Sequence, residues 1–66
     1  MIDKMIESAR GRVMISGPYD EDLVAYMRRV GLARYWDADD KLYDMPEEMF
    51  LDDVREHLHQ LGYELV

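Results

Sequence analysis

The chain has 66 residues and a net charge of −7 at pH 7, with 48% hydrophobic residues and no cysteine. This length allows one domain over residues 1–66, and the lack of cysteine excludes disulfides and thiolate metal sites. The hydrophobic content is sufficient for folding, and no apolar run is long enough to cross a membrane. The N-terminus does not resemble a signal peptide, so we expect a cytoplasmic protein.

The charge is distributed unevenly along the chain. Residues 1–36 hold six basic and five acidic residues, whereas residues 37–66 hold ten acidic and two basic residues. Such a negative field repels nucleic acid and attracts basic surfaces, including those of proteins that hold nucleic acid. Eight of the ten acidic residues form a dense tract: Asp37, Asp39, Asp40, Asp44, Glu47, Glu48, Asp52 and Asp53.

The first half of the chain predicts a helix, a strand and a second helix. Apolar residues at helical spacing before Gly11 predict a short helix over residues 2–10. The β-branched segment 12–16 predicts a strand that ends at a Gly-Pro pair. Asp20 is a favourable N-cap for a helix over residues 21–30, whose first turn is acidic and whose last turn is basic.

The second half predicts a hairpin, a helix and a strand. Aromatic and aliphatic residues favour strands, a polar segment favours a turn, and a proline often opens a helix. The predicted elements are strands at 32–36 and 41–45 around a turn at 37–40, a helix at 47–61 and a strand at 63–66. From residue 12 onward this order predicts an α+β, ferredoxin-like β-α-β-β-α-β fold. Its four-stranded, mainly antiparallel sheet would carry two helices on one face.

The sequence contains no convincing catalytic or metal-binding motif. Residues 37–48 have the length of a calcium loop, but Lys41 and Leu42 replace a ligand and the sharp-turn glycine. His57 and His59 diverge on a helix and cannot bind one metal together. The serines lie outside nucleophile motifs, and the glycines form no phosphate-binding cluster. We therefore predict a protein that is not an enzyme and has no catalytic, metal or cofactor-binding residues.

Aromatic residues and arginine are expected on the open face of the sheet. Strand alternation would place Arg34, Trp36 and Tyr43 there, away from the helices. Trp36 and Tyr43 either stabilise the hairpin as a cross-strand pair or belong to an interaction patch. The acidic tract has two interpretations as well, a solvated surface or a surface that binds a partner.

Residues 36–46, WDADDKLYDMP, resemble the hairpin of the HARP-type module, which accompanies annealing helicase motors and occurs in related prokaryotic proteins. The shared pattern is a tryptophan-aspartate pair, a polar turn, a lysine, an aromatic two residues later and a proline. Segments 18–24 and 61–63 resemble the same module, so the likeness spans about residues 12–66. It implies the β-α-β-β-α-β fold and recognition of nucleic acid or protein without catalysis. In size and charge the chain is also similar to phage-encoded inhibitors, including anti-CRISPR proteins.

The first functional hypothesis is an inhibitor or adaptor that binds a basic, nucleic-acid-binding protein, such as a CRISPR effector subunit. Its eight tract carboxylates would imitate phosphates, with Trp36 and Tyr43 as anchors, and it would bind neither nucleic acid nor membranes directly. The alternative is a HARP-like module that contacts nucleic acid or protein through Arg12, Arg34, Trp36 and Tyr43. A third hypothesis, a small subunit or antitoxin-like partner, uses the same surface as the first.

Overall fold

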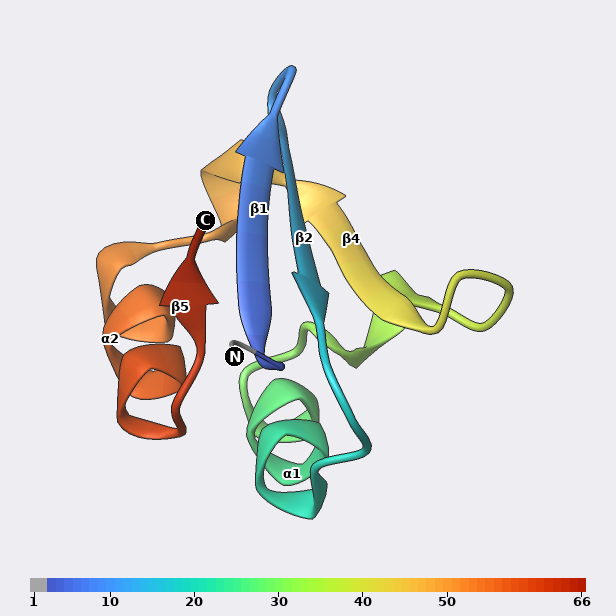
Figure 1. Ribbon diagram of the computed structural model, residues 1–66, viewed down its shortest axis with the longest axis vertical. Coiled ribbons are helices and arrows are strands. Elements are labelled where there is room, and N and C mark those ends of the chain that lie inside the picture. The colour runs from blue at the N-terminus through green and yellow to red at the C-terminus, as the bar shows by residue number, and fades with distance from the viewer. Residues whose placement is uncertain (1–2) are drawn as a thin grey trace.

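The computed structural model describes residues 3–66 as an α+β fold with a five-stranded mixed sheet and two α-helices (Figure 1). The sheet has the strand order β3-β4-β2-β1-β5. No helix within residues 3–66 has the length and apolar character needed to cross a membrane. The elements are β1 (Met5–Ala9), β2 (Arg12–Ser16), α1 (Glu21–Arg29), η1 (Ala33–Tyr35), β3 (Trp36–Asp37), β4 (Leu42–Pro46), η2 (Glu47–Met49), α2 (Asp52–Gln60) and β5 (Glu64–Leu65).

The first element is a strand, so the predicted helix over residues 2–10 is wrong where the structure describes it. All of β1 pairs antiparallel with β2. Arg10 and Gly11 connect the two strands with φ angles of 55° and 76°, which is the left-handed geometry of a two-residue hairpin turn. Gly11 therefore serves a hairpin rather than a helix end. Residues 1 and 2, the start of the predicted helix, lie outside the described residues.

The extra strand changes the far edge of the sheet. β2, β4 and β3 are antiparallel neighbours, in agreement with the predicted sheet. β1 is antiparallel to β2 and parallel to β5, so β5 runs opposite to β2 without pairing with it. The predicted four-stranded, mainly antiparallel sheet is thus matched only in part, because a fifth strand, β1, separates β2 from β5 and pairs in parallel with β5.

The predicted strand over residues 32–36 is mostly a 3₁₀ turn. Leu32 is buried, and its N–H donates to the carbonyl of Met27 at 2.8 Å, which holds this segment against the end of α1. Only Trp36 and Asp37 pair with β4. The predicted strand at 41–45 is confirmed as β4, displaced by one residue.

The predicted helix over residues 47–61 is divided into η2 and α2. Phe50 has a ψ angle of 75°, which is not helical, and this residue ends η2 before α2 begins. Met49 and Phe50 pack against the core, so the chain bends here to bury apolar side chains before α2 begins. The final predicted strand is confirmed as the shorter β5. The predicted helix at 21–30 is confirmed as α1.

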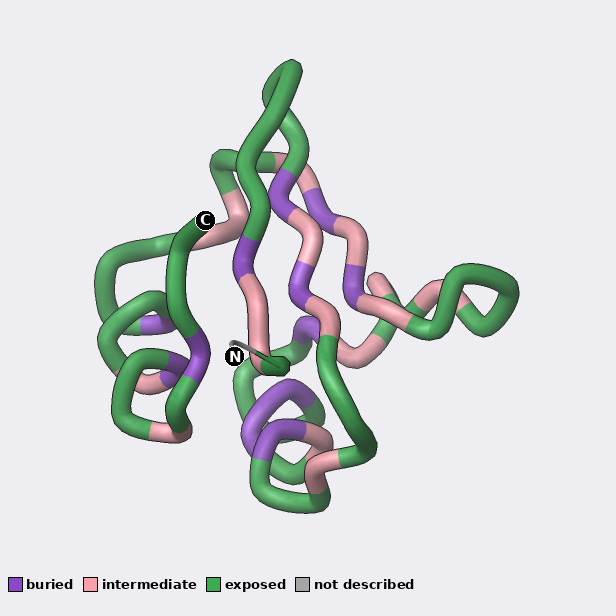
Figure 2. Tube along the Cα trace, viewed as in Figure 1, coloured by how far each residue is buried: buried purple, intermediate pink, exposed green. Residues whose placement is uncertain are grey.

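One hydrophobic core lies between the sheet and both helices, and burial alternates along the central strands (Figure 2). Ile15 and Tyr43 are directly opposite each other on β2 and β4, so both point into this core. The prediction that Tyr43 lies on the open face is therefore wrong. The same holds for Trp36, which is directly opposite Tyr43 on β3 and shares its face. The buried residues are Ile6, Val13, Ile15, Leu23, Tyr26, Met27, Leu32, Tyr43, Met45, Val54, Leu58 and Tyr63.

Candidate protein-binding surface

The acidic tract begins in the turn between β3 and β4. The Asp37 carboxylate accepts the N–H groups of Asp39 and Asp40 at 3.0 and 3.1 Å, and this local bonding explains why the segment forms a turn. Asp39 and Asp40 are exposed, whereas Asp37 is half-buried. Lys41 completes the turn with a φ angle of 57°. The turn therefore presents two free acidic side chains at the β3 edge of the sheet.

Asp44 lies on the open face of β4 and is neutralised there. The Arg12 guanidinium donates to its carboxylate at 3.0 Å and to its backbone carbonyl at 3.3 Å. Both side chains are partly exposed, so the pair adds little stability. Its consequence is electrostatic, because Asp44 and Arg12 cancel each other on the face that was expected to bind a partner.

Glu47 and Glu48 lie in η2 near the β1–β2 turn, and both are exposed. The Ser8 hydroxyl donates to the Glu47 carboxylate at 3.2 Å. The Glu47 N–H donates to the carbonyl of Gly11 at 2.9 Å, which ties this junction to the β1–β2 hairpin. Glu47 and Glu48 thus lie at a different place on the molecule from the carboxylates of the β3–β4 turn.

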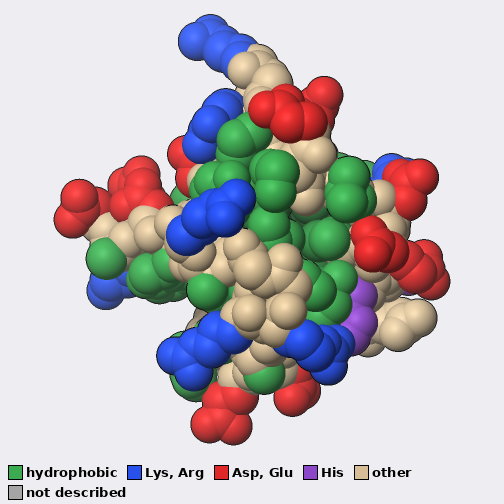
Figure 3. Space-filling view, turned by 180° about the vertical axis from the view of Figure 1, so that it is seen from behind, with side chains coloured by type: hydrophobic (Ala, Val, Ile, Leu, Met, Phe, Trp, Pro, Cys, Tyr) green, Lys and Arg blue, Asp and Glu red, His purple; other side chains and the backbone are tan. Residues whose placement is uncertain are grey.

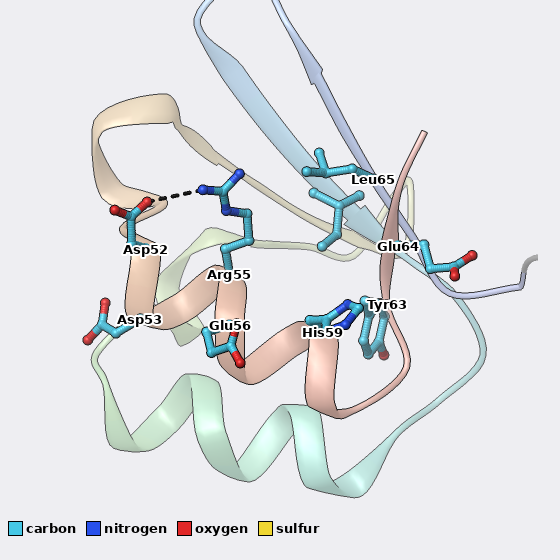
Figure 4. Close-up of a pocket in the computed structure, with 9 residues that line it drawn as sticks. Asp52, Asp53, Arg55, Glu56, His59, Tyr63, Glu64 and Leu65 are labelled. Carbon is cyan, nitrogen blue, oxygen red and sulfur yellow. Dashed lines mark hydrogen bonds and ion pairs between the residues drawn. The ribbon is translucent and has the colours of Figure 1, made fainter.

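The end of the tract lines an open groove between α2 and β5 (Figure 4), which we call the acidic groove. Asp52 and Asp53 occupy the first turn of α2, where the helix dipole favours negative charge. Glu56 projects from the same helix, while the Glu64 side chain projects from β5 away from α2, on the face of Met5 rather than that of Ile6. The Arg55 guanidinium pairs with Asp52 at 3.3 Å.

Glu56 and Glu64 are two acidic residues that the sequence analysis did not assign to the candidate surface. Glu56 stands three and four positions after Asp53 and Asp52, which is the spacing of neighbours on one helix face. That spacing could have identified Glu56. Glu64 could not be found in this way, because its position depends on the parallel pairing of β5 with β1.

Most carboxylates in the second half of the chain have no cationic partner. Of the ten acidic residues from position 37 onward, Asp44 and Asp52 alone form ion pairs within residues 3–66. The unpaired carboxylates are spread over the molecule. On the face opposite to Figure 1, acidic side chains stand at several separate places around a hydrophobic centre, interspersed with basic ones (Figure 3). The continuous tract in the sequence is therefore discontinuous in space.

Trp36 and Tyr43 form a cross-strand pair at the edge of the sheet. Their rings meet edge to face, with centroids 5.0 Å apart, a favourable geometry for aromatic pairs. Tyr43 is 5% exposed and Trp36 is 49% exposed. The stabilising interpretation of this pair thus accounts for Tyr43 and leaves much of the indole surface free.

A partly buried polar network centred on Asp20 connects α1 with both ends of the described chain. Its carboxylate accepts the Tyr63 hydroxyl at 3.2 Å and the Lys4 ammonium at 3.3 Å. Burial would raise the pKa of Asp20, but the N–H of Leu23, the Lys4 ammonium and the N–H of Asp22 outweigh it, so this pKa lies below its usual value. Burial, with Asp20 nearby, strongly raises the pKa of Tyr63.

The histidines and carboxylates do not assemble into a metal site within residues 3–66, where no group of three potential ligands converges. His57 is half-buried and stacks on Tyr26 with ring centroids 3.8 Å apart. His59 is exposed beside the acidic groove. The Asp37 carboxylate is already occupied by the N–H groups of its own turn.

The chain matches no family model, no curated protein and no solved structure.

Proposed function

We propose that this chain is a non-enzymatic acidic protein that binds a basic, nucleic-acid-binding protein in the cytoplasm. Its carboxylates stand in for phosphates and occupy the nucleic-acid site of that partner. The target class is a bacterial defence protein such as a CRISPR effector, which makes the chain a phage-type inhibitor. A small subunit or an antitoxin-like partner would use the same surface.

The observation that carries this proposal is the excess of unpaired negative charge. Eight of ten carboxylates from position 37 onward have no cationic partner within residues 3–66. Like charges held together in a folded protein repel one another, and a basic partner relieves this repulsion. The same charges give no counterion release on nucleic acid, so a direct complex with DNA is disfavoured.

We assign the principal contact to the acidic groove. A basic partner that docks over it meets Asp53 and Glu56 on α2 and, on the outer side of β5, Glu64, whose side chain points away from α2. Arg55, which pairs with Asp52, lies between the two elements. The β3–β4 turn, with Asp39 and Asp40, forms a second acidic site on the opposite edge of the sheet. The edges are far enough apart in the strand order that charge reversal can test each site separately.

The experiment uses the immobilised protein to capture its partner from the native host, followed by identification and titration of the purified partner. Asp53→Lys with Glu56→Lys should slow association and reduce its dependence on salt, because exposed charges mainly steer encounter. Asp39→Lys with Asp40→Lys tests the turn. Glu21→Lys with Asp22→Lys is the matched control, since these exposed residues lie in the first turn of α1 and change the net charge equally.

Two outcomes would contradict nucleic-acid mimicry. One is a complex that is insensitive to salt and to both surface reversals. The other is a partner that binds DNA and this protein simultaneously, because imitation of phosphates requires competition for one site. A fluorescence-anisotropy titration of single-stranded and branched DNA at low salt completes the test. Micromolar or tighter binding of the free protein to DNA would favour the alternative function below.

A HARP-like recognition module remains the second candidate, because the element order from β2 onward supports it. The order is β2-α1-β3-β4-α2-β5, with β4 between β2 and β3. We propose that these elements are a ferredoxin-like unit into which β1 has been inserted, between β2 and β5. The surface first expected to bind nucleic acid requires revision in this case, since Tyr43 is buried and Arg12 is paired with Asp44.

A further inference from the structure

A second cavity, of about 360 Å³, lies away from the acidic groove, between the β2–α1 loop, the start of α1 and the β3–β4 hairpin. Tyr19, Trp36 and Tyr43 supply aromatic surface to it, and we call it the aromatic pocket. Ile15 and Leu23 add apolar walls. The pocket and the acidic groove share a single lining residue, Tyr63, so they can be altered independently.

Folding alone does not account for the aromatic side chains around this pocket. Tyr19 is 80% exposed and Trp36 is 49% exposed, so a large apolar area remains in contact with water. Tyr43 is 5% exposed and lines the cavity. The hydroxyls of Tyr35 and Tyr63 have hydrogen-bond partners within residues 3–66, whereas that of Tyr43 has none there. The pocket is therefore lined by aromatic surface and by the hydroxyls of Tyr43, Tyr19 and Ser16, which form no hydrogen bond within residues 3–66.

The electrostatic surroundings of the pocket favour a cation. The chain carries a net charge of −7. Ala38 lines the pocket from within the acidic turn, where its neighbours in sequence are Asp37 and Asp39. Asp20 also lines it, but its carboxylate already accepts bonds from Tyr63, Lys4 and two N–H groups. Attraction would thus come from aromatic faces and the surrounding field rather than from a free carboxylate.

We propose that the aromatic pocket binds an arginine side chain of the basic partner. A guanidinium group is planar, stacks on aromatic faces and keeps N–H donors at its edge. One of these donors can bond the Tyr43 hydroxyl, whose oxygen accepts. An ammonium is more strongly hydrated, and a quaternary ammonium has no N–H donor for this hydroxyl. The inference rests on the proposed function in one respect, that the partner is basic.

The ionisation state of Tyr43 agrees with this assignment. Burial raises the pKa of Tyr43, Arg28 partly opposes this, and Tyr19 adds to it, so the phenol stays neutral at physiological pH. Lys41 is the one lysine or arginine that lines the pocket within residues 3–66, and it repels a second cation. Replacing Lys41 with glutamate should therefore strengthen binding of an arginine side chain.

Binding can be measured directly, because Trp36 is the only tryptophan in the chain. The probe is a blocked glycine-serine peptide with one central arginine, titrated at low salt while indole fluorescence is recorded. We expect a saturable change with a millimolar dissociation constant. An otherwise identical peptide with citrulline, which has a similar shape without the charge, should bind at least about fivefold more weakly. Lysine, trimethyllysine and leucine peptides complete the series.

Variants then locate the binding site. Tyr19→Ala should weaken arginine binding about 5- to 30-fold, as expected for the loss of a cation–π contact. Since Tyr19 is 80% exposed, this change should leave the thermal midpoint unaltered. Leu51→Ala is the control, because Leu51 is 58% exposed and does not line the pocket. Tyr43→Phe keeps the ring and should reduce the preference for arginine over trimethyllysine.

Several results would overturn the proposal. Equal binding of citrulline would mean that charge is not recognised, and equal binding of leucine would indicate a general apolar pocket. Tighter binding of trimethyllysine would identify a quaternary-ammonium site instead. No saturable signal, or no effect of Tyr19→Ala, would remove the site altogether. Free peptides need no partner protein, so failure here leaves the acidic groove untested, and failure of the groove reversals leaves this measurement intact.

Discussion

At the scale of single residues, Asp20 connects three parts of the chain through one carboxylate. It caps α1 through two N–H groups and bonds Lys4 before β1 and Tyr63 before β5. Its side chain is 12% exposed, so these bonds form in a partly dry environment, where an unmet partner is costly. The sequence identified its capping role, but the contacts with Lys4 and Tyr63 required the tertiary fold.

Asp20→Asn should destabilise the protein at neutral pH by about 1 kcal/mol, because the amide keeps an oxygen for the cap but loses the charge that pairs with Lys4. The pKa of Asp20 is lower in the folded chain, so its carboxylate contributes stability above the unfolded pKa of about 3.9. That contribution is lost as pH falls through the folded pKa. Urea midpoints of the two proteins should therefore converge in acid, whereas a constant difference would contradict the assigned role.

Arg10 has a φ angle of 55°. Apart from asparagine and aspartate, residues other than glycine rarely adopt this left-handed conformation. Arg10→Asn should stabilise the protein by about 0.5–1 kcal/mol, because Asn-Gly is the preferred pair for this type of turn. Arg10→Ala is the matched control, since it removes the same exposed side chain without relieving the backbone. If both variants raise the urea midpoint equally, the loss of the arginine side chain rather than relief of the backbone is responsible.

At the scale of elements, patterns with strong local signals were predicted correctly. The cap and charged turns of α1, the β-branched residues of β2 and the strand β4 follow from the sequence alone. β1 was missed because the spacing of its apolar residues also fits a helix. The hairpin at Arg10-Gly11 and the pairing with β5 stabilise the strand instead. Likewise, the burial of Tyr43 depends on register with β2, which no local pattern specifies.

The strand β1 makes a specific prediction for two adjacent residues. Ile6 is 2% exposed, whereas Met5 is half-buried on the opposite face. Ile6→Ala should cost roughly 3 kcal/mol, and Met5→Ala clearly less, because only the first leaves a cavity in the core. Thermal melting measures both variants. Interstrand NMR contacts between Ile6 and Ile15 should accompany the result, and helical chemical shifts over residues 5–9 would contradict it.

At the scale of the whole molecule, the sequence predicted the amount of negative charge well but not its positions in space. The excess after position 37 is evident from composition, but the tract is divided between the β3–β4 turn, η2 and the acidic groove. Chain folding separates residues that are neighbours in sequence and places Glu64 at the β5 rim of the groove. A linear count of carboxylates therefore predicts the sign of the surface charge, and it does not predict how that charge is arranged on the surface.

The distribution of charge also predicts how the free protein responds to salt. The folded chain concentrates unpaired carboxylates that the unfolded chain can spread apart, so their repulsion opposes folding. Because salt screens exposed charges over about 10 Å at 0.1 M, sodium chloride should raise the urea midpoint of the wild-type protein. Neutralising Asp53 and Glu56 to asparagine and glutamine should raise the midpoint at low salt and reduce this dependence.

The matched comparison is neutralisation of Glu21 and Asp22, which are also exposed and acidic but lie in the first turn of α1. This variant has the same net charge as the groove variant, so a smaller effect would show that charge position matters as well as total charge. A midpoint that falls as sodium chloride is added would contradict the argument. Repulsion within the acidic groove would then be weak, so its relief would contribute little to the binding of a basic partner. The proposed function would lose its energetic basis.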